Sequence, residues 1–317
     1  MSRNATMFGR DMTFLGVDPC TLDEPATYEG ADVVIVSAPS DPRHGDRPSL
    51  PLRVDAVRQL RVLDAGDVGT LPEGTAGTEG TAGNTAAVAE AVTRIARSGA
   101  VPFVLGTDRT IGLSAASGVA RQHGTGRIAV VHIDAHADTG TIRSGHPHGH
   151  GRPMSRLLEA GAVRAHRLVR MGPCGGWPLP GTQPDGPGVR SYPMTEILTR
   201  GLDACVDEAT AVAVSDCDGV FLAIDLHVSA PGTTPGADPP GGLTSRGLLD
   251  TVRRLACEVP LVGMDVVEAS TPHDYADITA FLRHRVVLEA LSGVASRSRG
   301  DTWRPARPLL VGRGTTV

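Results

Sequence analysis

The chain has 317 residues, a net charge of −5, 40% hydrophobic residues and only 3% aromatic residues, which suits one α/β domain whose core rests on aliphatic side chains. Lysine and arginine form no block, and no apolar run approaches about 18 residues, so the sequence predicts neither a nucleic-acid partner nor a membrane span. The five cysteines are scattered without a Cys-x-x-Cys pair, which predicts a reduced, cytoplasmic protein.

Residues 1–30 read as an irregular N-terminal arm, and residues 31–39 as the first strand. The segments 39–51 and 66–84 are rich in Pro, Gly or Thr and are predicted loops, and Asn84 is predicted to cap the helix that follows it. Strands are then predicted over 101–106, 128–133, 167–172, 220–225 and 260–268, and helices near 110–121, from 153, near 195–209, from 245 and from 274. This alternation predicts a mostly parallel sheet with helices on both faces, a single three-layer α/β/α domain over residues 1–317.

Candidate metal ligands stand at the ends of two of these strands. Asp134, His136 and Asp138 alternate after the first, and Asp225 and His227 follow the second. Strand geometry sends residues i, i+2 and i+4 to one face, so the first three side chains point together if the extended backbone continues. An Asp/His loop that makes turn and cap hydrogen bonds is the alternative. Two such endings favour a metal site at the carboxyl edge of the sheet, where open α/β folds bind ligands.

Together with further motifs in the same order, these endings resemble the ureohydrolase superfamily of arginase and agmatinase. The matching segments are LGTDRT at 105–110, DAHAD at 134–138, HGHG at 148–151, GGLT at 241–244 and VGMDVVEAS at 262–270. The DVVEAS…DYADITA pattern is closer to agmatinase-type members than to arginase. The resemblance runs from about residue 31 nearly to the C-terminus, and it implies an arginase-like sandwich and a homo-oligomer, a trimer or a hexamer.

In that superfamily two Mn²⁺ ions share a bridging hydroxide, which attacks a guanidinium carbon and releases urea. The resemblance assigns four residues of this chain to the metal centre: Asp134, His136, Asp138 and Asp225. The chain departs from the pattern at Arg109, where the family has a His, and at His227, where it has an Asp. Ala223 also replaces the usual Ser.

Charge counting predicts one ion rather than two. The three aspartates supply −3, so two divalent ions plus Arg109 would leave +2, whereas one ion plus Arg109 balances the charge. By family correspondence the ion is expected at Asp134, His136, Asp225 and His227, with Arg109 paired to Asp138 in place of the second ion. The family implies Mn²⁺, and a set with two His and two Asp ligands also admits Zn²⁺, Ni²⁺ or Fe²⁺.

Three residues are candidates for catalysis by the same resemblance. His150 matches the family His that shuttles protons to the leaving amine, although His146 and His148 are close in sequence and the His-rich run can also be a surface loop. Glu268 matches the Glu that holds the substrate guanidinium, with a salt-bridged rim residue as the alternative. Asp138 is counted among the catalytic residues as well as the ligands.

The sequence leaves two main functions open. The first is a metal-dependent, agmatinase-like amidinohydrolase that acts on a small guanidino compound, and the retained ligand set together with His150 and Glu268 favours it. The second is a catalytically impaired homologue that serves as a structural or regulatory subunit, which the loss of the family His at Arg109 favours. Hydrolysis of a different C–N bond, in an amidine or formimino group, is a third possibility.

Overall fold

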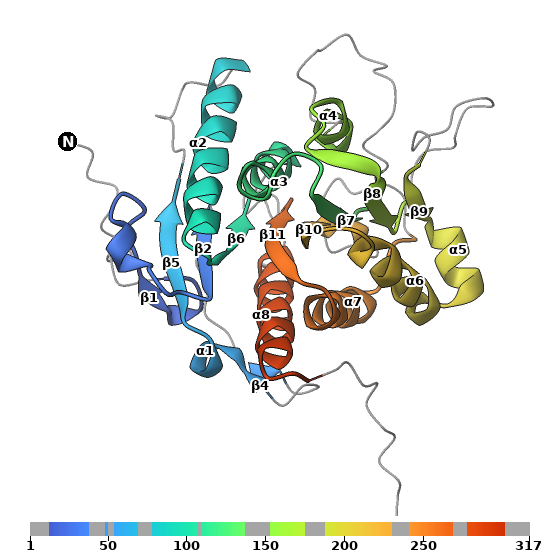
Figure 1. The fold of residues 1–317 in the computed structure, drawn as a ribbon. Helices are drawn as coiled ribbons and strands as arrows, with labels where there is room; N and C mark the ends of the chain where they lie inside the picture. The colour runs from blue at the N-terminus through green and yellow to red at the C-terminus, as the bar shows by residue number, and fades with distance from the viewer. Residues whose placement is uncertain are drawn as a thin grey trace, which may run out of the picture.

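A nine-stranded sheet, in which every strand runs parallel to its neighbours, forms the middle layer of the structure (Figure 1). The computed structural model describes residues 13–37, 48–49, 54–68, 78–106, 109–136, 153–174, 188–229, 241–268 and 278–301. In sheet order the strands are β1 (Asp18–Pro19), β5 (Val62–Asp67), β2 (Val33–Ser37), β6 (Val101–Leu105), β11 (Leu261–Val267), β10 (Gly219–Asp225), β7 (Ile128–Ile133), β8 (Val163–Met171) and β9 (Arg190–Tyr192). A separate antiparallel pair joins β3 (Pro48–Ser49) to β4 (Val54–Asp55).

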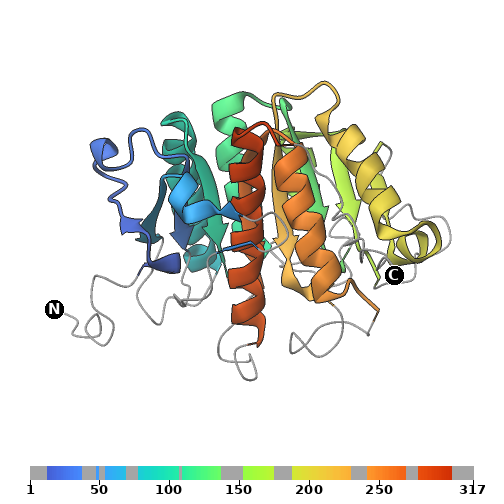
Figure 2. The same ribbon diagram turned by 90° about the horizontal axis from the view of Figure 1, so that it is seen from below.

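Helices cover both faces of this sheet, so the predicted three-layer α/β/α architecture is confirmed (Figures 1 and 2). One face carries α2 (Thr78–Arg97), α3 (Arg109–His123) and α4 (Pro153–Glu159). The other carries α5 (Met194–Arg200), α6 (Leu202–Val214), α7 (Ser245–Glu258) and α8 (Ile278–Ser298), with the short α1 (Ala56–Gln59) beside α8. Short 3-10 turns lie at Phe14–Gly16, Pro25–Thr27 and Leu226–Val228.

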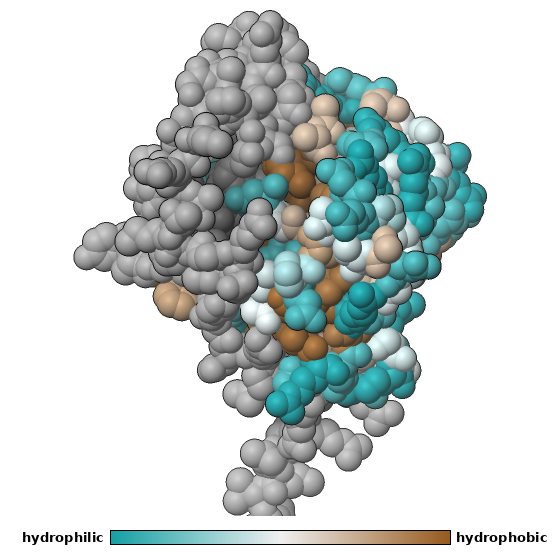
Figure 3. Space-filling view, turned by 90° about the vertical axis from the view of Figure 1, so that its left-hand side faces the viewer, coloured by the Kyte–Doolittle hydropathy of each residue, from teal (hydrophilic) through white to brown (hydrophobic). Residues whose placement is uncertain are grey.

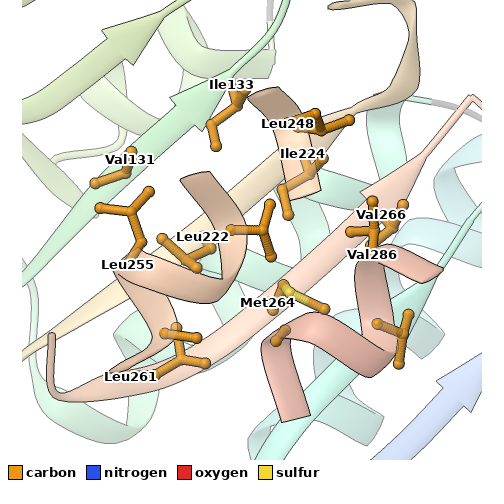
Figure 4. Close-up of a cluster of buried hydrophobic side chains, with 14 of the residues drawn as sticks. Val131, Ile133, Leu222, Ile224, Leu248, Leu255, Leu261, Met264, Val266 and Val286 are labelled. Carbon is orange, nitrogen blue, oxygen red and sulfur yellow. The ribbon is translucent and has the colours of Figure 1, made fainter. Parts of the chain in front are cut away.

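The central strands are apolar along their whole length because helices bury them from both sides. Every residue of β7 and β10 is buried. Their side chains alternate between two cores: Val131 and Leu222 face α7 and α8 (Figure 4), whereas Val130 and Phe221 join the core under α2 and α3. Burying side chains of this size stabilises the fold by about 1.5–3 kcal/mol each. The middle of the sheet therefore holds the residues at the ends of its strands in fixed positions.

The order of the strands explains how distant parts of the chain come together. After β6 the chain passes over two sheet positions to form β7, and β10 and β11 later fill the gap. The four adjacent strands β6, β11, β10 and β7 therefore end at one edge, and Arg109, Glu268, Asp225 and Asp134 follow them in that order. Such a crossing is where open α/β sheets bind ligands.

Two helix predictions were wrong in their boundaries. α2 begins at Thr78, so Asn84 lies inside this helix and does not cap it. The apolar periodicity of a sequence marks only the part of a helix that packs on the core. Once a helix has formed, adding a residue costs little further free energy, so the helix can extend beyond that part. The helix predicted over 195–209 is two helices, because Gly201 has a φ of 88° between α5 and α6.

The sequence also missed five strands and a short helix. β1, β3, β4, β5, β9 and α1 were not predicted, and strand 31–39 is not the first of the chain, because β1 precedes it and pairs with β5. The arm predicted for 1–30 is therefore ordered in its described part. The predicted loop 39–51 contains β3, and the predicted loop 66–84 begins inside β5 and ends inside α2. Strands of two or three residues, such as β1, β3, β4 and β9, are too short to show a period.

Seen from the side of β1, the described surface is mostly hydrophilic with small hydrophobic patches (Figure 3). Within the described ranges, the large apolar side chains that are exposed are Leu198, Val214, Ile278 and Phe281. No helix of this part of the chain has the length and apolar character that crossing a membrane requires.

Candidate metal centre

Two identical Asp-x-His turns build the site. β7 ends at Ile133, and the Asp134 carboxylate accepts the backbone N–H of His136 at 2.9 Å. β10 ends at Asp225, whose carboxylate accepts the backbone N–H of His227 at 2.8 Å. These turns bend each His back beside its own Asp, and the two imidazole rings come within 5.8 Å, centroid to centroid. The backbone bends at residues 135–136 instead of continuing extended, so these turns, and not strand alternation, bring the two imidazoles together.

A single donor set suitable for an ion results. His136, Asp225 and His227 each offer one ligand atom, and these atoms lie within 4.8 Å of one another. Ligands bound about 2.0–2.2 Å from one ion lie up to about 4.4 Å apart, so small side-chain adjustments complete the geometry. Asp134 lies behind this set: its Oδ1 is 3.0 Å from His136 Nδ1, and its buried Oδ2 accepts no hydrogen bond from the described residues. The residues present thus fit a divalent ion.

The pKa values of the two aspartates shift in opposite directions, although both are 1% exposed. Burial raises the pKa of Asp134, but the hydrogen bond from His136 and the neighbouring positive charge of Arg109 outweigh it, so the pKa is lowered. The pKa of Asp225 is raised, first by burial and then by the negative charge of Asp134. Two adjacent buried carboxylates that resist joint ionisation indicate a site made for a cation.

Arg109 supplies a cation at this place. Its Nε lies 2.7 Å from Asp225 Oδ2, and its Nη2 lies 2.5 Å from His136 Nδ1 and 3.1 Å from His227 Nδ1. The sequence predicted Arg109 beside Asp138, away from the ion. Asp138 lies outside the described residues, so that pair stays a prediction, but the guanidinium contacts the donor set itself.

Glu268 closes the cluster from β11. Its Oε1 is 3.5 Å from Arg109 Nε, and its Oε2 is 3.9 Å from His227 Nδ1. The residue has a φ of 63°, in the left-handed region that non-glycine residues rarely adopt. Strained backbone of this kind concentrates at functional sites, and here it places a carboxylate, 22% exposed, at the mouth of the site.

The sequence missed a buried row of ionisable residues one step below the site. Arg170, His132, Ala223 and Asp265 are paired in register across β8, β7, β10 and β11. His132 Nε2 lies 3.5 Å from Asp134 Oδ2. Burial lowers the pKa of His132 to about 4 and raises that of Asp265 well above its usual range, so both favour their neutral forms. The sequence held one signal of this row: His132 precedes Asp134 by two residues and therefore lies on the same face of the strand.

Because His132 favours its neutral form in the folded protein, the free energy of unfolding is expected to fall at acidic pH. Its pKa is about 4 when folded and 6.5 when unfolded, so its contribution is fully present above pH 6.5 and is lost as pH falls toward 4, because the unfolded chain then binds the proton more readily. The loss is on the order of 3 kcal/mol at 1.36 kcal/mol for each pKa unit. Urea unfolding with a chelator at several pH values should show this loss in the wild type and not in His132→Gln. Equal pH dependence of the two proteins would contradict the prediction.

Two predicted site residues fall where the structure gives no placement. Asp138 and His150 lie outside the described residues, as do the neighbouring His146 and His148. Cys174 is half-buried and packs against the core, and its backbone N–H donates to the Ala135 carbonyl at 3.0 Å. All five cysteines are free thiols.

Comparisons with known proteins give relatives of this chain and agree with its fold. A family model described as "Arginase family" matches residues 29–293. A formimidoylglutamase of Halalkalibacterium halodurans is 30% identical over 249 residues, which cover 76% of this chain and 75% of that protein. The proclavaminate amidinohydrolase of Streptomyces clavuligerus is 28% identical over 299 residues, covering 85% of this chain and 90% of that protein. A solved structure of a hypothetical agmatinase from Burkholderia thailandensis shares the fold, with a TM-score of 0.75 at 23% identity over 92% of this chain and 93% of that one.

Proposed function

Because this chain belongs to the arginase family, we propose that it is a metal-dependent amidinohydrolase that cleaves a C–N bond of a small guanidino or related amidino compound. The observation that carries the proposal is the meeting of His136, Asp225 and His227 with Glu268 at the ends of adjacent central strands. The names of relatives, a formimidoylglutamase and an amidinohydrolase among them, support this class of substrate.

His136, Asp225 and His227 are the described residues that would hold the ion, with Asp134 orienting His136 and with Asp138 added on sequence grounds. When bound, a divalent ion supplies Lewis-acid chemistry that makes water nucleophilic near neutral pH. We propose Mn²⁺ from the family resemblance, and the two His ligands admit Zn²⁺, Ni²⁺ or Fe²⁺. We propose one ion rather than two, because the described residues bring together one donor set.

Glu268 is proposed to bind the substrate cation. A carboxylate and a guanidinium form paired, charge-assisted hydrogen bonds, and the Glu268 side chain faces the donor set across 3.9 Å to His227. Water adds to the central carbon, the C–N bond to the substituent breaks, and the amine leaves with a proton that His150 is proposed to deliver. A guanidino substrate thus yields an amine and urea, and a formimino substrate yields an amine and formamide.

A catalytically impaired subunit is the second candidate. The observation that favours it is the Arg109 guanidinium, whose Nη2 contacts both imidazoles of the donor set. In either case we propose a cytoplasmic homo-oligomer. The family resemblance supports the oligomer, and the free thiols support the cytoplasm. Light scattering on the purified protein measures the number of subunits.

The test is a screen of guanidino and formimino compounds with purified protein and each of Mn²⁺, Zn²⁺, Ni²⁺ and Fe²⁺, with urea, ammonia and amine as readouts. Turnover that depends on the metal supports the hydrolase. Absence of turnover across the panel, with metal shown to be bound, overturns it in favour of the subunit.

Glu268→Ala is expected to raise KM for the active substrate about 10- to 100-fold, since a hydrogen bond to a charged group is worth about 1.5–3 kcal/mol. Glu268→Gln is the matched variant, because it keeps the shape and removes the charge, and the same direction is expected. Steady-state kinetics measure both. An unchanged KM in the two variants would show that Glu268 is a rim residue.

A further inference from the structure

The Arg109 guanidinium touches both the donor set and the residue proposed to bind the substrate. It contacts the donor set of His136, Asp225 and His227, and it also lies 3.5 Å from a carboxylate oxygen of Glu268. Arg109 is the first residue of α3, and its side chain is 14% exposed. A single internal guanidinium therefore sits both where an ion would bind and where a substrate guanidinium would bind.

Space and charge make this contact exclusive. Nδ1 of His136 faces Asp134 Oδ1 at 3.0 Å and Nδ1 of His227 faces Asp225 Oδ1 at 3.2 Å, and Arg109 Nη2 contacts both nitrogens, at 2.5 Å and 3.1 Å. A guanidinium is a cation with donors only. An ion held about 2.0–2.2 Å from ligand atoms of these two rings would stand next to Nη2, and the two positive charges would repel.

We propose that the Arg109 guanidinium and a divalent ion are alternative occupants of the His136–Asp225–His227 site, so that metal uptake requires Arg109 to withdraw. The inference rests on the proposed function for the identity of the site, and it adds that this chain controls its own metal content. The chain carries the competing cation itself, so the wild type takes up metal weakly.

The surroundings of Arg109 support an exchange of this kind. The Arg109 side chain is 14% exposed, so the guanidinium is in contact with solvent and is not sealed in the core. Removing the Arg109 charge leaves Asp134, Asp225 and Glu268 without that compensating cation. The site should then bind a divalent ion more tightly and should be less stable when no ion is supplied.

The experiment compares the wild type with Arg109→Ala and with Arg109→Gln, which keeps more of the side-chain volume. Zn²⁺ and Mn²⁺ are the probes, and titration calorimetry and elemental analysis give their affinity and number per chain. We expect both variants to bind the ion at least about tenfold more tightly than the wild type, which corresponds to 1.4 kcal/mol. Thermal unfolding should show variants that melt below the wild type with a chelator and gain more from added metal.

Two controls locate the effect. Arg127→Ala removes a guanidinium paired with Asp218 beyond the opposite end of β7 and should leave metal affinity unchanged. Adding His227→Ala to Arg109→Ala should abolish the gained affinity. Equal metal affinity in the wild type and both Arg109 variants overturns the inference, as does a gain that survives loss of His227. These binding results stand apart from turnover: a gain in metal without any hydrolysis removes the proposed activity and leaves the exclusion intact.

Discussion

Replacement of His227 with alanine is expected to lower the affinity for the divalent ion at least about 100-fold and to reduce turnover with it. Loss of groups that merely orient ligands already costs 10- to 100-fold in metal affinity or activity, and His227 supplies one of the three clustered donors. The fold should survive, because Asp225 caps the turn through the backbone N–H of His227, at 2.8 Å, and this bond does not involve the imidazole.

Metal content and activity of the same preparation check this result. His166→Ala is the control, since it removes an exposed imidazole from β8 outside the cluster, and it should behave as the wild type. Full metal binding and turnover in His227→Ala would mean that the ion sits elsewhere, for example among the residues around Asp138 and His150.

The place of the site could be predicted from sequence because it depends on where buried strands end. Polar residues directly after apolar runs identified Asp134 and Asp225 without knowledge of strand order, since the carboxyl ends of parallel strands share one edge, and the family resemblance added Glu268. The partner of Arg109 could not be predicted in this way. Charge counting shows that one carboxylate balances the Arg109 guanidinium, but several carboxylates lie within reach of this long side chain. Only the folded arrangement shows that Asp225 and Glu268 lie beside it.

The buried row beneath the site was hidden for a different reason. Arg170, His132 and Asp265 belong to three strands that are far apart in sequence, and their alignment depends on the register of β8, β7, β10 and β11. Register between non-consecutive parallel strands leaves no local trace in the sequence. The alternation of β7 did place His132 on the face of Asp134, which is the one part of this row that a closer reading of the strand would have shown.

Behind the sheet, a buried ion pair joins the two helices that support β10 and β11. Arg253 of α7 and Glu289 of α8 are each 1% exposed, and Nε lies 2.7 Å from Oε2. Glu289 also pairs with Arg285 at 2.8 Å, and Arg253 with Asp250 at 2.7 Å. The helices approach closely, because a Cβ at Gly293 would lie 2.6 Å from the Arg253 carbonyl oxygen. Water therefore cannot easily enter and take the place of either Arg253 or Glu289 in the ion pair.

Glu289→Ala is accordingly expected to lower the free energy of unfolding by about 3–5 kcal/mol, since it leaves a buried guanidinium without its main counter-charge. Urea unfolding measures this loss. The paired replacement Arg253→Met with Glu289→Leu should recover most of it, because apolar side chains of similar volume often replace a buried ion pair at little cost. If the single variant were as stable as the wild type, Asp250 alone would suffice to neutralise Arg253. A double variant as unstable as the single one would show instead that these helices need the pair for their specific packing.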